Sequence, residues 1–313
     1  MGLFSGMFGL FGKRKAPPGT KRHVVLAAKK KKKDHTPRTD IKERFDLEQR
    51  IGQGSMSKVF RARDRKLGRQ ICLKILDKDK TARFDARFIG LERPHEGMVS
   101  TMLKHKNCVT TYEWGVTREG EIFLVMELIE GLGLNFLIET NARQLQGNRF
   151  NYLCQAAEGL HYIHERGYMH RDICPRNMMV TSQGVLKLID FGLTIPNTPD
   201  FRRPGNRTGT ANYMAPELIK RIATDQRVDL FALGVTAYEV FTAKLPWEGV
   251  QSLQAMQSHI NNTGRDPREI DPTLPDPLAK FLIKAIERDP RDRFQTALEL
   301  RDAARRLEEQ FPR

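Results

Sequence analysis

Three short motifs between positions 170 and 217 hold the residues of this chain that could carry out chemistry. Residues 170–177 have the pattern H-R-D-x-x-x-x-N, and the triplets D-F-G and A-P-E follow in that order. A carboxylate can accept a proton from a hydroxyl group, and carboxylates and amides supply the oxygen ligands that hard divalent cations take. Asp172, Asn177 and Asp190 are therefore candidates for a proton acceptor and for ligands of a divalent cation.

The three motifs, in this order, resemble the signature of eukaryotic-type (Hanks-type) serine/threonine protein kinases, in a form compatible with a bacterial member. The resemblance implies transfer of the γ-phosphoryl group of ATP to a serine or threonine hydroxyl of a protein substrate, with autophosphorylation. The implied metal is Mg2+, with Mn2+ as an alternative ion. Asp172 would accept the hydroxyl proton, while Asp190 and Asn177 would hold the metal. Residues 185–189 have the pattern of a buried strand, which would present Asp190 at its end.

A glycine-rich segment and a strand lysine resemble the nucleotide site of this family. Residues 51–59, I-G-Q-G-S-M-S-K-V, would form the glycine-rich loop, with Ser57 where the third glycine usually stands. Glycines allow a tight turn that brings backbone N–H groups close to phosphate. Residues 71–74, I-C-L-K, match the V-A-I-K motif, so Lys74 would bind the α- and β-phosphates. The residues that the resemblance assigns to ATP are Ile51, Gly52, Gly54, Val59, Cys72, Lys74, Met126, Glu127, Ile129 and Met179.

The expected partner of Lys74 is a glutamate on the helix that the family calls αC. Counting nine residues back from His105 gives Glu96, and Glu92 is the alternative. Pro94 indicates that the helix begins nearby, because proline suits a first helical turn.

The strand that leads into the hinge between the two lobes is expected at residues 123–128. Met126 would be the gatekeeper residue of the ATP pocket. Adenine would bind backbone groups of Glu127 and Ile129, so the identity of those side chains matters little.

The catalytic loop departs from the family pattern at one position and offers a substitute at another. Serine/threonine kinases usually carry lysine two residues after the catalytic aspartate, and Cys174 stands there. Arg176 stands where tyrosine kinases carry an arginine and would neutralise the γ-phosphate instead. Residues 209–217 match the serine/threonine pattern G-T-x-x-Y-x-A-P-E, with Thr210 bonded to the catalytic aspartate. The missing lysine also motivates an alternative, a pseudokinase that acts as a nucleotide-binding scaffold.

Other matches have structural or regulatory roles in the family. Asp229, in an apolar run, would bond the backbone of the catalytic loop, since a buried carboxylate needs partners. Glu217 would pair with Arg293. The activation segment, between the D-F-G and A-P-E motifs, offers three threonines for phosphorylation, with Thr208 preferred: Thr194, Thr198 and Thr208.

The composition is that of one catalytic domain. The chain has 313 residues, of which 39% are hydrophobic, enough for one two-lobe core. We expect an α+β kinase fold at residues 45–311, with a small β-rich N-lobe and its αC helix at about 45–130 and a larger, mainly helical C-lobe at about 131–311. The four cysteines form no C-x-x-C pair, which argues against a metal or disulfide framework and favours the cytoplasm.

The first 44 residues form a basic, partly apolar tail. Residues 1–45 carry 13 Lys/Arg and three Asp/Glu, which is most of the net charge of +15. Apolar positions 4, 7, 8 and 11 share one helix face and are followed by lysine runs, so the tail would either bind an anionic membrane surface, peripherally on the inner face of the cell membrane, or stay disordered. The apolar stretch is too short to span a bilayer. A uniformly basic surface for nucleic acid is not indicated.

Overall fold

The computed structural model describes most of the chain after the basic tail. The described residues are 37–53, 56–88, 90–205, 207–247 and 252–311. The predictions for residues 1–36 and for Gly54 lie outside the described residues. Within the described ranges no helix is both long enough and apolar enough to cross a membrane.

A twisted sheet builds the N-terminal part, and its strands lie in the order β1-β5-β6-β4-β3-β2. All neighbours are antiparallel except β1 and β5. Side chains of β4 alternate toward a buried layer around Ile71 and Leu73, as a strand with one covered face requires. The strands are β1 (Arg38–Thr39), β2 (Phe45–Gln53), β3 (Ser57–Asp64), β4 (Arg69–Leu76), β5 (Thr111–Thr117) and β6 (Ile122–Met126).

The folded part begins before Phe45, where we expected the domain to start. Arg38 and Thr39 pair in parallel with β5, and the short helix α1 (Ile41–Arg44) follows. Asp40 caps α1 by accepting hydrogen bonds from two backbone N–H groups, at 2.8 and 3.1 Å. Residues 38–44 therefore lie at the edge of the sheet, next to the domain start expected at Phe45.

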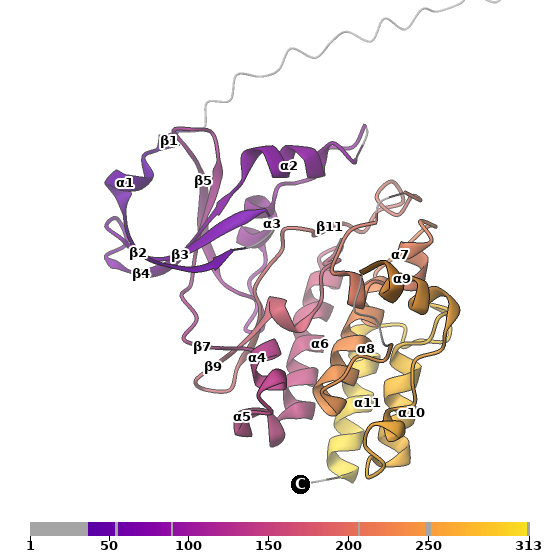
Figure 1. Cartoon of the computed structure of the whole chain (residues 1–313). Helices are drawn as coiled ribbons and strands as arrows, with labels where there is room; N and C mark the ends of the chain where they lie inside the picture. Colours follow the sequence, from indigo (N-terminus) through magenta and orange to yellow (C-terminus); the bar gives the residue numbers. More distant parts are fainter. Residues whose placement is uncertain (1–36, 54–55, 89, 206, 248–251, 312–313) are drawn as a thin grey trace, which may run out of the picture. The chain divides into compact units, whose positions relative to one another are not determined.

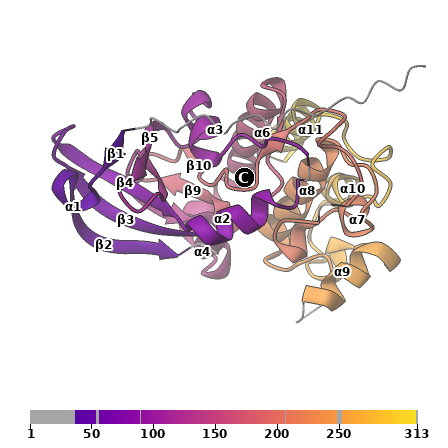
Figure 2. The same cartoon turned by 90° about the horizontal axis from the view of Figure 1, so that it is seen from above.

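Two short helices connect β4 to β5 where one αC helix was expected. The first, α2 (Lys78–Asp85), is capped by Asp77, which accepts a hydrogen bond from the N–H of Lys80 at 3.0 Å. The second, α3 (Glu96–Met102), begins two residues after Pro94, where the proline predicted a start. Figures 1 and 2 show α2 extending from the sheet toward the helical part of the chain.

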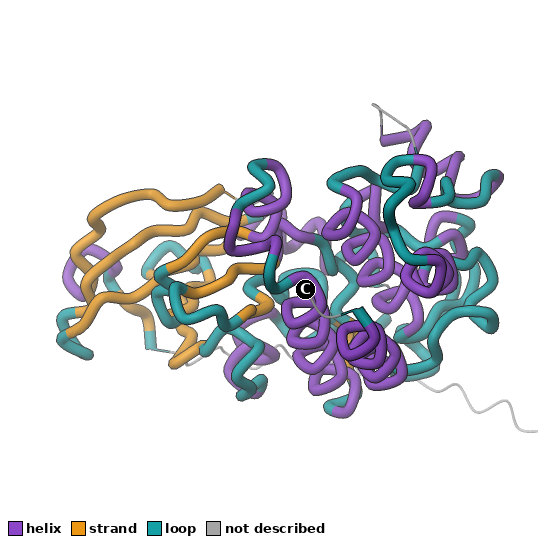
Figure 3. The backbone as a smooth tube through the Cα atoms, turned by 90° about the horizontal axis from the view of Figure 1, so that it is seen from below, coloured by secondary structure: helices purple, strands orange, loops and turns teal. Residues whose placement is uncertain are grey.

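The C-terminal part is mainly helical, and Figure 3 shows strands gathered at one end of the described chain and helices at the other. At its centre lies α8, which is apolar on all sides and almost wholly buried. The helices of this part are α4 (Leu134–Glu139), α5 (Arg143–Gln146), α6 (Arg149–Glu165), α7 (Pro216–Ile219), α8 (Arg227–Thr242), α9 (Ser252–Asn261), α10 (Asp276–Ala285) and α11 (Ala297–Gln310).

Short strands between the two parts place the catalytic motifs. The hairpin of β9 (Met178–Thr181) and β10 (Leu186–Leu188) has the H-R-D loop before it and the D-F-G triplet after it, so both motifs meet at one end of the hairpin. β7 (Gly131–Gly133) pairs with β9, and a Cβ on Gly131 would overlap the carbonyl oxygen of Val180. The remaining pair is β8 (Tyr168–Met169) with β11 (Ile195–Pro196).

Candidate active site

Lys74 on β4 joins two carboxylates from distant parts of the chain. Its Nζ lies 2.6 Å from Oε1 of Glu96 on α3 and 2.9 Å from Oδ1 of Asp190. Burial alone would lower the pKa of Lys74, but the neighbouring carboxylates outweigh burial and raise it. The ammonium group therefore stays charged, and Glu96, rather than Glu92, is its partner.

The backbone of α3 is fitted closely to the sheet at this point. His95 caps the helix, its Nδ1 accepting a hydrogen bond from the N–H of Met98 at 3.3 Å. The next residue after Glu96 is Gly97, where a Cβ would lie 2.7 Å from the side chain of Trp114 on β5. A glycine is needed there because any side chain would push α3, and with it the carboxylate of Glu96, away from β4.

The catalytic loop holds Asp172 by both carboxylate oxygens. Oδ1 accepts hydrogen bonds from the N–H and the hydroxyl of Thr210, at 2.9 and 2.8 Å. Oδ2 accepts one from Nδ2 of Asn177 at 2.8 Å, and the same amide nitrogen donates to the carbonyl of Asp172. This leaves the amide oxygen of Asn177 as the end that a cation would meet.

Asp229 at the start of α8 anchors the same loop from beneath, as the sequence predicted. Its carboxylate accepts hydrogen bonds from the backbone N–H groups of His170 and Arg171, at 2.8 and 2.7 Å, and contacts Nε2 of His164 at 2.9 Å. Arg171 has φ of +66°, a conformation that non-glycine residues rarely adopt. The two bonds to Asp229 stabilise this strained turn, which carries Asp172.

A small cavity of about 60 Å3 lies at this junction. Its lining includes Lys74, Asp172 and Asp190. Gly192 also lines it, and the N–H of Gly192 donates a hydrogen bond to Oδ1 of Asp190 at 2.8 Å. Thr81 of α2 also contributes to the lining, a contribution that sequence reasoning missed.

Strand register brings several of the residues predicted to bind ATP together. Val59 on β3 lies opposite Gly52 on one side and Lys74 on the other. Cys72 lies opposite Met126 across β4 and β6. Among the residues predicted to bind ATP that the structure describes, Lys74 alone lines the cavity. The other described residues of that set do not line this cavity: Ile51, Gly52, Val59, Cys72, Met126, Glu127, Ile129 and Met179.

The two unusual catalytic-loop residues have different surroundings. Cys174 is buried, with its Sγ 3.9 Å from the hydroxyl of Thr210. Burial raises the pKa of this thiol to about 12, so it stays protonated. Arg176 is exposed on the turn η1 (Pro175–Asn177) and does not line the cavity, so its predicted contact with phosphate stays a prediction.

The threonine preferred for phosphorylation is closed off in this conformation. Thr208 and Thr194 are both buried, whereas Thr198 is exposed. The sequence showed hydroxyl groups in a loop but not which of them the loop folds inward. A kinase could reach Thr208 only after this part of the segment opened.

Comparison with known proteins agrees with the geometry. A family model described as protein kinase domain matches residues 45–303. A probable serine/threonine-protein kinase of Clostridium acetobutylicum is 30% identical over 266 residues, which cover 84% of this chain and 40% of the relative. A second probable serine/threonine-protein kinase, of Clostridium perfringens, is 32% identical over 258 residues, with 82% and 37% covered.

The serine/threonine-protein kinase PknB of Mycobacterium tuberculosis is 28% identical over 272 residues, which cover 85% of this chain and 43% of the relative. The chain thus spans about two fifths of the length of the curated relatives it matches. The family match, the Lys74–Glu96 ion pair and the sheet followed by helices agree with one another. The chain therefore belongs to the protein kinase domain family.

Proposed function

We propose that this chain transfers the γ-phosphoryl group of ATP to serine or threonine hydroxyls of protein substrates, its own included. The observation that carries the proposal is the meeting of Lys74, Asp172 and Asp190 on one cavity. Phosphoryl transfer needs mainly positioning and charge stabilisation, and these three side chains would supply a phosphate-binding cation, a proton acceptor and a metal ligand. The similarity to bacterial proteins named as serine/threonine-protein kinases supports the same reaction.

Asp172 is the residue proposed to accept the proton of the substrate hydroxyl. Its carboxylate is fixed on both oxygens, so it can keep one orientation while a hydroxyl group approaches. The bond from Thr210 ties this orientation to the segment before the A-P-E motif, where the sequence has the serine/threonine pattern. This link supports serine and threonine as acceptors.

The donor set around Asp190 fits a divalent cation such as Mg2+ or Mn2+. Burial would raise the pKa of Asp190, but Lys74 and the N–H of Gly192 hold it below its usual value, so the carboxylate is charged. Asp190 and the amide oxygen of Asn177 would hold the metal. When bound, the metal would neutralise charge on the phosphate oxygens. Lys74 would bind the phosphates while Glu96 keeps its ammonium group in place.

We infer that Arg176 replaces the missing catalytic-loop lysine. Cys174 is buried and uncharged, so it cannot neutralise phosphate. Arg176 is exposed two residues further on, next to Asn177. A guanidinium group can bind phosphate through a planar fork of donors.

The proposal is tested with ATP labelled on the γ-phosphate, Mg2+ and a generic protein acceptor. We expect label transfer by the wild type, a loss of about 10²–10⁴-fold in Asp172→Ala and of about a hundredfold in Arg176→Ala. Arg306→Ala, which changes an exposed arginine of α11, is the matched control and should keep full activity. A wild type that binds ATP but transfers no label would support the nucleotide-binding scaffold instead.

The domain limits and the partners of the tail are part of the same proposal. We propose that residues 45–311 form the catalytic domain and that residues 38–44 extend it. Binding of the basic tail to an anionic membrane, and a cytoplasmic location, stay predictions from the sequence. Flotation of the full chain with vesicles that contain phosphatidylserine, at low and high salt, would test the tail, because attraction to anionic lipid weakens with salt.

A further inference from the structure

Arg93, between α2 and α3, connects helix α2 to the start of the activation segment. Its Nη1 donates hydrogen bonds to the carbonyls of Gly192 and Thr194, at 3.2 and 3.3 Å. Its Nε donates to Oδ1 of Asp85, the last residue of α2, at 2.9 Å. The guanidinium group also lies over the ring of Phe84, 4.7 Å from the ring centre. One side chain thus contacts two segments about a hundred positions apart.

Arg93 is buried, so its charged side chain depends on these contacts. The side chain is 3% exposed, and a buried charge is unfavourable unless it is paired and hydrogen-bonded. Asp85 supplies the opposite charge, and the two carbonyls accept the N–H groups that point toward the activation segment. The bonded carbonyls belong to residues two and four positions after Asp190, so the contact restrains the backbone immediately next to the proposed metal ligand.

An apolar cluster covers the same segment. Phe84 and Phe88, on and just after α2, pack with Met169 of β8 and Ile195 of β11, and all four side chains are buried. Partly buried side chains surround them from the segments on either side: Met56, Leu91, Leu193 and Phe201. Helix α2 and the activation segment therefore share one small core, in addition to the polar contacts of Arg93.

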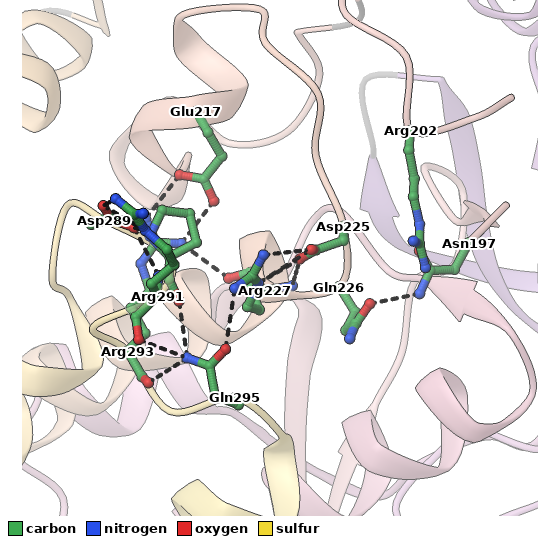
Figure 4. A network of polar contacts seen from close by, with 11 residues as sticks. Asn197, Arg202, Glu217, Asp225, Gln226, Arg227, Asp289, Arg291, Arg293 and Gln295 are labelled. Carbon is green, nitrogen blue, oxygen red and sulfur yellow. Dashed lines mark hydrogen bonds and ion pairs between the residues drawn. The ribbon is translucent and has the colours of Figure 1, made fainter. Parts of the chain in front are cut away.

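A second anchor holds the middle of the activation segment against α8. Asn197 donates a hydrogen bond from Nδ2 to Oε1 of Gln226 at 2.8 Å, and Arg202 donates from Nε to Oδ1 of Asn197 at 2.8 Å. The N–H of Thr224 donates to the carbonyl of Arg202 at 3.0 Å. Figure 4 shows these side chains pointing toward one another.

We propose that Arg93 is a positioning residue that holds the D-F-G segment in the place where the carboxylate of Asp190 meets Lys74. Arg93 fixes the carbonyls of Gly192 and Thr194 to α2, and the carboxylate of Asp190 then faces Lys74. The effect on catalysis rests on the function proposed above, whereas the effect on order in the segment does not.

The test compares hydrogen exchange with catalysis in variants of the full chain. In Arg93→Met, backbone amides of residues 191–197 should exchange about tenfold faster, since a hydrogen bond from a charged donor is lost. The kcat for labelled phosphate transfer should fall about 10–100-fold, as for partners that orient metal ligands, with a smaller change in the KM for ATP. Arg93→Lys keeps the positive charge but not the planar guanidinium donors. Its amide exchange rates and its kcat should lie between those of Arg93→Met and those of the wild type.

Arg83→Met is the matched control, because Arg83 is an exposed arginine of α2 itself. Asp85→Asn removes the carboxylate partner of Arg93, and it replaces Arg93→Met in the same measurements if Arg93→Met does not fold. Faster exchange confined to residues 191–197 in Arg93→Met or Asp85→Asn supports the proposal. Exchange equal to that of Arg83→Met overturns it, and so does unchanged kcat in an active protein. A wild type without transfer activity would contradict the proposed function, while the exchange result would still decide the role of Arg93.

Discussion

Lys74–Glu96 and Glu217–Arg293 are both buried ion pairs, and they differ in what surrounds them. Arg293 is fully enclosed and donates to both oxygens of Glu217, at 2.7 and 2.8 Å, and to three backbone carbonyls. Figure 4 shows this group at the loop before α11. Lys74 instead faces a cavity, and its second partner, Asp190, has a side chain that is 37% exposed.

The difference indicates two uses of buried charge. The donors of Arg293 all end on protein acceptors, so the pair is suited to holding the helices near the A-P-E motif in one arrangement. Lys74 has an ammonium group with three donors, and a phosphate group entering the cavity could bind it. The same interaction type would therefore serve stability in one region and, in the proposed function, phosphate binding in the other.

Replacement of Lys74 by methionine should have the largest effect, which is a loss of activity. Loss of the phosphate-binding cation should lower kcat/KM for labelled ATP on the order of 10²–10³-fold. The free energy of unfolding should fall less than in Arg293→Met, because both variants leave a buried glutamate without its cation but Arg293→Met also leaves three backbone carbonyls without their donor. Lys280→Met, at an exposed lysine of α10, is the control. Retained activity in Lys74→Met would remove the distinction between the two pairs.

Replacement of Arg293 by methionine should have the second largest effect, which is a loss of stability. It leaves the buried carboxylate of Glu217 without its cation, which lowers the free energy of unfolding by about 3–5 kcal/mol in chemical denaturation. Arg291 provides a matched control two residues away, because it pairs with Asp289 but is 82% exposed. Arg291→Met should leave the free energy of unfolding close to that of the wild type, because an exposed ion pair contributes little to stability. Equal losses in the two variants would contradict the role assigned to burial.

The smallest effect is expected for the pH dependence of stability that Asp229 causes. Burial would raise the pKa of Asp229, but His164 and the backbone N–H of Arg171 hold it below its usual value. The carboxylate therefore stabilises the fold above the unfolded pKa of 3.8, and this contribution is lost as the pH falls through the lower folded pKa.

Unfolding of the wild type and of Asp229→Asn at a series of pH values measures this contribution. The difference in unfolding free energy should be constant above about pH 5 and should narrow below about pH 4. A difference that widens in acid would show that the pKa of Asp229 is raised in the folded state.

Much of the proposed site was predictable because its chemistry depends on residue type at fixed spacing. Asp172, Asn177 and Asp190 were found from their motifs, and the structure brings Asp172 and Asp190 to one cavity. The partner of Lys74 was chosen by a count from a distant histidine, and the structure contains that ion pair. The anchoring role of Asp229 followed from a carboxylate in an apolar run.

Helix α2 and Arg93 were not predictable from the same patterns. Helix α2 has eight residues, of which Phe84 alone is buried, so no periodic apolar face announces it. Arg93 donates to backbone carbonyls about a hundred positions away, and carbonyls carry no residue identity in a sequence. The two-residue strand β1 is also too short for a recognisable pattern.

The edge strand before Phe45 matters for anyone who prepares a shortened form of this protein. A fragment cut at the first residue of the family match would lose β1, α1 and the guanidinium group of Arg44, which lies 2.8 Å from Oδ2 of the buried Asp64. The carboxylate of Asp64 would keep only the backbone N–H groups of Lys66 and Leu67, and the edge of β5 would be open to other chains. Such a fragment is expected to aggregate, whereas one that begins before Arg38 keeps its sheet covered.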